Sequence, residues 1–79
     1  MDQREASIVW TAFEEVAPNL CYIQRTREFL EALMEEMGDI GQLSNRLEGG
    51  LSEIKNPSFR TDIKILGERL KRKQTPLKG

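Results

Sequence analysis

Carboxylates are the side chains in this sequence best able to do acid–base chemistry, and their spacing limits what they can do. The pairs at residues 14–15 and 35–36 are adjacent in sequence. On a helix the members of each pair point about 100° apart, so they do not share a site. Glu28, Glu31 and Glu35 do share a helical face that could bridge a metal ion. The chain has no histidine and no second helix of matching carboxylates, so a solvated acidic face is the favoured interpretation.

The sequence also contains no pattern that indicates a catalytic nucleophile or a phosphate-binding loop. Cys21 is the only cysteine, and without histidine it has no activating base, so we interpret it as a small, half-buried hydrophobe. The serines and threonines lack a base for the same reason. The glycines of residues 47–51 follow no strand and precede no lysine, unlike a phosphate-binding loop. The sequence therefore predicts a non-enzymatic protein without a cofactor or a bound metal.

The length of 79 residues corresponds to a single domain, which we place at residues 1–73, with a flexible tail at 74–79. A lone thiol, no signal-like segment and no apolar stretch long enough to span a membrane predict a cytoplasmic protein. A folded chain of this size buries only about 60% of its unfolded surface. Since a disulfide within the chain is impossible, we expect oligomerisation to supply part of the stability.

Local signals predict an all-α fold with a first helix at residues 3–16 and a last helix at 57–72. Asp2 is a plausible N-cap for the first helix, which Pro18 ends or kinks. Asn56 followed by Pro57 predicts the start of the last helix. The apolar stripe of that helix consists of Phe59, Ile63, Leu66 and Leu70.

The segment between residues 19 and 55 admits two interpretations. Asp39 followed by Gln42 resembles a capping box that would start a separate helix at Ile40. However, the apolar residues keep one heptad frame across Gly38 and Gly41, which favours one long central helix with a hinge allowed at those glycines. In that interpretation a coiled-coil-like seam mediates association, and it consists of Leu30, Leu33, Met37, Ile40, Leu47, Leu51 and Ile54.

Charge is divided sharply along the chain. Residues 1–54 carry four basic and eleven acidic side chains, whereas residues 55–79 carry eight basic and two acidic ones. Solvated helix faces explain this division most simply, and attraction between the last helix and the acidic part of the same or a second chain comes next. The third interpretation is contact with nucleic acid or an anionic membrane, for which the candidate anion contacts are Arg69, Lys71, Arg72 and Lys73.

A faint family resemblance covers about a third of the chain. Residues 23–30, Gly38 and residues 43–48 are similar to the small aspartyl-phosphate phosphatases of spore-forming bacteria, which are helical hairpins with a Ser-Gln-x-Leu-Asp signature. Here Asn45 stands in place of the glutamine and Glu48 in place of the aspartate. Because of these departures, we do not assign the chain to that family.

Taken together, the sequence predicts a small all-α bundle that works as a protein–protein interaction module: an adaptor, small chaperone or regulatory subunit. The expected partner is a second copy or another helical protein. Trp10 and Phe13 lie at the apolar face of the first helix and are the candidate partner contacts. The alternative function is a regulator that touches nucleic acid through the basic last helix.

Overall fold

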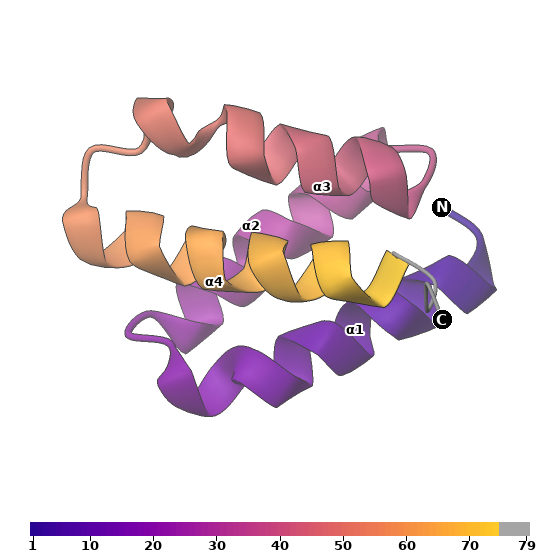
Figure 1. Ribbon diagram of the computed structural model, residues 1–79, viewed down its shortest axis with the longest axis horizontal. Coiled ribbons are helices and arrows are strands. Elements are labelled where there is room, and N and C mark those ends of the chain that lie inside the picture. The colour runs from indigo at the N-terminus through magenta and orange to yellow at the C-terminus, as the bar shows by residue number, and fades with distance from the viewer. Residues whose placement is uncertain (75–79) are drawn as a thin grey trace.

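The computed structural model describes residues 1–74, and these residues form an all-α fold. Four α-helices follow one another along the chain, with short 3₁₀ turns after the first and the third (Figure 1). The helices are α1 (Gln3–Val16), α2 (Ile23–Glu36), α3 (Ile40–Gly49) and α4 (Pro57–Gln74), and the 3₁₀ turns are η1 (Ala17–Asn19) and η2 (Leu51–Glu53). The predicted all-α class is confirmed.

Two of the helix starts arise from local caps that were predicted from sequence. The Asp2 carboxylate accepts a hydrogen bond of 2.8 Å from the Arg4 backbone N–H at the start of α1. The Asn56 side chain accepts from the backbone N–H groups of Ser58 and Phe59, at 2.9 and 3.2 Å. Both side chains satisfy backbone donors that the first turn of a helix leaves without partners. α4 ends at Gln74, two residues later than predicted, and most of the predicted tail lies outside the described residues.

The favoured prediction of one long central helix is wrong, because the helix is interrupted between Met37 and Asp39. Met37 adopts an extended conformation, and Asp39 accepts a hydrogen bond of 2.8 Å from the Gln42 backbone N–H to start α3. The Gln42 side chain in turn accepts from the Gly38 N–H at 2.9 Å. The bond between Asp39 and the Gln42 N–H is the half of the capping box that the alternative interpretation anticipated, whereas the Gln42 side chain bonds the residue before the cap. The start of α2 also differs, since it lies at Ile23 and not at residue 19 or 20.

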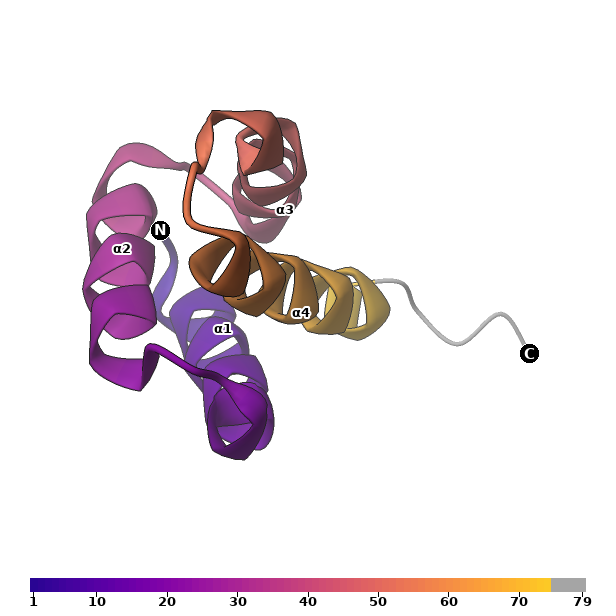
Figure 2. The same cartoon turned by 90° about the vertical axis from the view of Figure 1, so that its left-hand side faces the viewer.

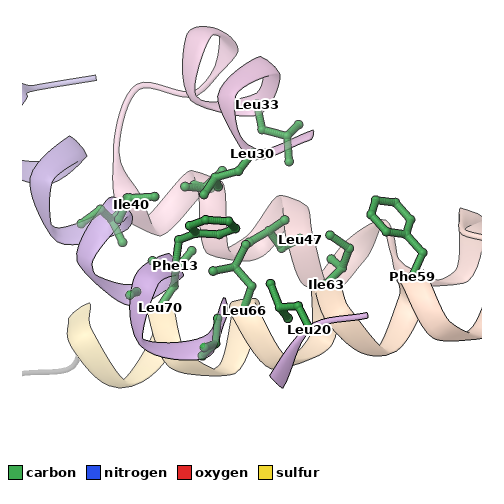
Figure 3. Packing of buried hydrophobic residues seen from close by; sticks show 14 residues of the cluster. Phe13, Leu20, Leu30, Leu33, Ile40, Leu47, Phe59, Ile63, Leu66 and Leu70 are labelled. Atoms are coloured by element: carbon green, nitrogen blue, oxygen red, sulfur yellow. The ribbon is translucent and has the colours of Figure 1, made fainter. Parts of the chain in front are cut away.

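α4 is the central element of the bundle. It lies between α1 and α3 and runs antiparallel to both, while α2 crosses behind it (Figure 1). The view turned by 90° shows α1, α2 and α3 arranged around α4 (Figure 2). The predicted stripe of α4 is buried and faces its neighbours (Figure 3). The whole apolar core comprises Val9, Ala12, Phe13, Val16, Leu20, Leu30, Leu33, Ile40, Leu43, Leu47, Phe59, Ile63, Leu66 and Leu70.

Candidate functional site

The seven residues of the predicted association seam do not form one surface stripe. Leu30, Leu33, Ile40 and Leu47 are buried in the core of the single chain. Met37, Leu51 and Ile54 are half-buried and pack against that core. The heptad frame therefore describes packing within the chain, because α2 and α3 each need an apolar face of the same spacing to cover α4.

The candidate partner contacts on α1 divide in the same way. Phe13 is only 7% exposed and belongs to the core. Trp10 is half-buried and stands edge-to-face against Phe13, with 5.8 Å between the ring centroids. The Arg27 guanidinium of α2 lies 6.0 Å from the Trp10 ring. Trp10 therefore keeps part of its surface in a hollow between α1 and α2, whereas Phe13 is not accessible to a partner.

Three of the four candidate anion contacts on α4 form ion pairs with neighbouring helices. Arg69 and Lys73 both contact Glu15 of α1, and Lys71 contacts Glu48 of α3, each at 2.9 Å. The hydrogen bond from Lys73, with the charge of nearby Arg69, holds the pKa of Glu15 below its ordinary value. The hydrogen bond to Glu48 raises the pKa of Lys71.

These contacts explain the charge division along the sequence. The basic α4 lies against acidic side chains of α1 and α3 in the same chain, so part of its charge is neutralised within the fold. Exposed pairs of this kind add little to stability. Arg72, the fourth candidate, is exposed and forms no ion pair with any residue in the described part of the chain.

An open, mainly apolar depression lies elsewhere, between α2 and the segment that connects η2 to α4. We call it the α2–α4 groove. Its volume is about 650 Å³. Phe29 and Ile54 are half-buried at its floor beside the buried Phe59. The Phe29 and Phe59 rings pack edge-to-face with centroids 5.6 Å apart. The remaining lining residues are Arg25, Glu28, Glu53, Lys55 and Asn56.

Aromatic and cationic side chains meet at one end of this groove. The Arg25 guanidinium lies 4.8 Å from the centre of the Phe59 ring, a distance at which a cation is attracted to the ring face. Tyr22 packs edge-to-face against the same ring with centroids 6.4 Å apart. The Asn56 amide donates a long hydrogen bond of 3.4 Å to the Tyr22 hydroxyl. Phe59 therefore connects the groove to the start of α2.

Among residues 1–74, the large apolar side chains that stay more than a third exposed lie at the start of α2. Tyr22 is 39% exposed and Ile23 is 46% exposed. They stand out against a core in which most large apolar residues are buried. Of the two, Tyr22 packs on the Phe59 ring and so extends the apolar surface of the groove. Apolar surface of this kind is typical of a contact site.

A buried carboxylate on α4 holds the start of α2 in place. Asp62 is fully buried and reaches across to two backbone donors. The N–H of Cys21 donates to both carboxylate oxygens, at 2.9 and 3.1 Å, and the N–H of Tyr22 donates to one of them at 2.7 Å. α2 has no side-chain cap of its own. Asp62 therefore fixes the two residues that lead into α2, Cys21 and the N-cap Tyr22, from a distant helix, whereas Asp39 and Asn56 cap the first turns of their own helices.

Sequence reasoning missed this role of Asp62, although a signal was present. Asp62 lies between the stripe residues Phe59 and Leu66, three and four positions away on the same helical face. A carboxylate on an apolar face is unfavourable unless it finds donors. Its position thus indicated that some backbone or side-chain donor had to meet it, although not which one.

Cys21 is exposed and unpaired as a thiol. Among residues 1–74, no group of three or more carboxylate or cysteine side chains converges so that it could hold a metal ion. Within the same range, no helix is both long and apolar enough to cross a membrane.

Comparison with known proteins gives one relationship. The family model of the MJ1579 family matches residues 11–75, which is most of the chain. The chain belongs to the MJ1579 family. The matched region runs from α1 through α4, so it includes every residue of the α2–α4 groove and Asp62. No curated protein and no solved structure matches the chain significantly.

Proposed function

We propose that this member of the MJ1579 family is a non-catalytic protein–protein interaction module of the cytoplasm: an adaptor, small chaperone or regulatory subunit. The α2–α4 groove is its contact surface. The observation that carries the proposal is the open apolar floor of the groove, with Phe29 and Ile54 half-buried beside Phe59, and with Tyr22, 39% exposed, packed on the Phe59 ring at its end. Burying such side chains against a partner is favourable by about 25 cal/mol for each Å² of apolar surface removed from water.

The composition of the groove suits a protein partner. Aromatic side chains, with a tyrosine at the rim and an arginine stacked on a ring, are the residue types that contribute most to protein interfaces. Phe29 and Phe59 supply a rigid apolar floor, which costs little conformational entropy when it is covered. We thus assign to the groove the partner contact that the sequence analysis predicted for the heptad seam.

Two matched variants test this proposal. Lys55 lies at the rim of the groove and Arg72 lies on α4, and both are exposed. Lys55→Glu and Arg72→Glu therefore change the net charge equally and affect two different surfaces. Tagged wild-type protein and both variants are purified from the native host. Mass spectrometry identifies the proteins that accompany them, and untagged copies of the chain are counted among these proteins.

We expect Lys55→Glu to lose protein partners that Arg72→Glu retains. If both variants keep the same partners as the wild type, the groove is not the contact surface. Loss of bound nucleic acid with Arg72→Glu, together with unchanged proteins in both preparations, would favour the alternative function through the basic helix.

A further inference from the structure

We infer that the partner at the α2–α4 groove is a second copy of this chain, which docks groove to groove across a two-fold axis. This inference rests on the proposed function and names its partner. The groove is bordered by four exposed charged side chains, two of each sign: Arg25 and Lys55, and Glu28 and Glu53. Within residues 1–74, none of these four forms an ion pair.

Equal numbers of opposite charges make this rim compatible with a two-fold interface. In such an interface the same patch meets itself, so a residue that contacts a given partner residue is contacted by its own copy in return. A rim of one sign would repel its copy and would call for an oppositely charged partner. In contrast, when two copies of this groove face each other across a two-fold axis, each charge of one rim can pair with an opposite charge of the other rim.

The spacing on α2 points to a particular pairing. Arg25 and Glu28 are three residues apart, about one helical turn, and both line the groove. When α2 meets its copy in antiparallel orientation, Arg25 faces Glu28 of the second copy and Glu28 faces Arg25. Two ion pairs thus form around the apolar floor that contains Phe29. Ala32, the next residue along α2 toward its C-terminal end on this side, is small and exposed and does not obstruct the approach.

Long-range electrostatics do not oppose this pairing. The formal net charge of the whole chain is −1 at pH 7, so two copies approach with little mutual repulsion. The acidic side chains that would otherwise repel are partly neutralised by α4, through Glu15 and Glu48.

A charge-swap experiment tests the pairing directly. Arg25→Glu and Glu28→Arg are prepared separately, and solution mass is measured by size-exclusion chromatography with light scattering over a range of concentrations. Wild type is expected at twice the 9.1 kDa of one chain. Each variant places like charges face to face twice, so its self-association weakens roughly tenfold or more. An equimolar mixture of the two variants restores the dimer, because every contact is then again between opposite charges.

The control exchange uses charges on the other flank of α2. Arg27→Glu and Glu31→Arg lie beside Trp10 in the hollow between α1 and α2 and should leave the wild-type mass unchanged. Circular dichroism confirms that each variant is folded, and the double variant Arg25→Glu/Glu28→Arg is expected to dimerise by itself.

Three results would overturn the inference. They are a wild type that stays at 9.1 kDa at every concentration, a mixture that does not recover the dimer, and a control pair that dissociates as readily as the groove variants. If wild type is a monomer while Lys55→Glu still loses a protein that Arg72→Glu retains, the groove binds a different protein. The proposed function then stands and the second copy does not. If neither effect is seen, both are wrong.

Discussion

The hydrogen bonds from α2 to Asp62 lead to a specific expectation for Asp62→Asn. The substitution keeps the size of the side chain but replaces one acceptor oxygen with an NH₂ donor. In the wild type both oxygens accept, from the Cys21 N–H at 2.9 and 3.1 Å and from the Tyr22 N–H at 2.7 Å. An asparagine oxygen placed where the shared oxygen lies can still accept from both N–H groups, which lie 3.1 and 2.7 Å from that position. The acceptor is then neutral, and the NH₂ group takes the place of the oxygen that accepts from Cys21 at 2.9 Å, so it faces the Cys21 N–H.

The magnitude follows from replacing a charged acceptor with a neutral one. Hydrogen bonds to a charged group contribute about 1.5–3 kcal/mol each and those between neutral groups about 0.5–1.5 kcal/mol, and loss of a negative charge near a helix N-terminus adds roughly 0.3–1 kcal/mol. Relief from burying a charge at this fully buried position offsets a part of this cost. We therefore expect a loss of about 2 kcal/mol in the free energy of unfolding. In a domain of this size such a loss lowers Tm by roughly 8–16 °C.

Urea denaturation followed by far-ultraviolet circular dichroism measures this loss. The matched control is Asp39→Asn, because Asp39 caps α3 through one local hydrogen bond at an exposed site. Asparagine is as good an N-cap as aspartate, so the control should cost less than about 0.5 kcal/mol. Equal free energies of unfolding for the two variants would refute the claim that Asp62 anchors α2 from across the bundle.

Three further expectations follow from single sites. Thr26 is fully buried, and its hydroxyl has no hydrogen-bond partner among the described residues, so Thr26→Val should leave stability unchanged or raise it by up to about 1 kcal/mol; a clear loss in urea denaturation would contradict this. At Gly67 an added Cβ would meet the Leu47 Cβ at 3.6 Å, an ordinary contact, so Gly67→Ala should raise Tm, consistent with a gain of about 0.5–1 kcal/mol; a lower Tm would show that α3 and α4 have no room for a methyl group. The pKa of Glu15 is lowered chiefly by Lys73, so the stabilisation by this pair is present above the ordinary carboxyl pKa of 4.5 and is lost as the pH falls through the lowered value. The free energy of unfolding of Glu15→Gln, measured in urea, should therefore differ from that of wild type at pH 7 and converge with it at pH 2–3. A difference that stays constant with pH would show that the pair is not responsible.

Local chemistry explains what could be predicted from the sequence. Asp2 and Asn56 act within a few residues of their own position, so their capping roles can be recognised without knowledge of the fold. The stripe of α4 repeats with helical spacing, and it is buried as predicted. Asp39 also acts locally, and its capping signal was a better guide to the start of α3 than the heptad frame.

Features that depend on distant contacts could not be predicted in the same way. The heptad frame continues across Gly38 by coincidence of phase, since any two helices that cover the same core need apolar residues three and four positions apart. Whether such residues face their own chain or a second one depends on where the chain turns. Asp62 and Cys21 are 41 positions apart, and no periodicity links an acceptor on one helix to donors at the start of another.

The candidate site shows the same limit. Arg25, Phe29 and Phe59 come from two helices whose packing creates the groove, and nothing in their sequence spacing brings them together. The sequence analysis predicted contacts at Trp10, Phe13 and the seam, and most of these residues are buried in the core of the single chain.

Site-specific photocrosslinking in cells of the native host tests the central claim, that the chain meets another protein at the α2–α4 groove, most directly. A photoreactive phenylalanine replaces Lys55 at the rim of the groove, or Thr61, which is exposed on α4 outside the groove. We expect a discrete protein adduct from position 55 and none from position 61. No adduct from position 55, or equal adducts from the two positions, would contradict it.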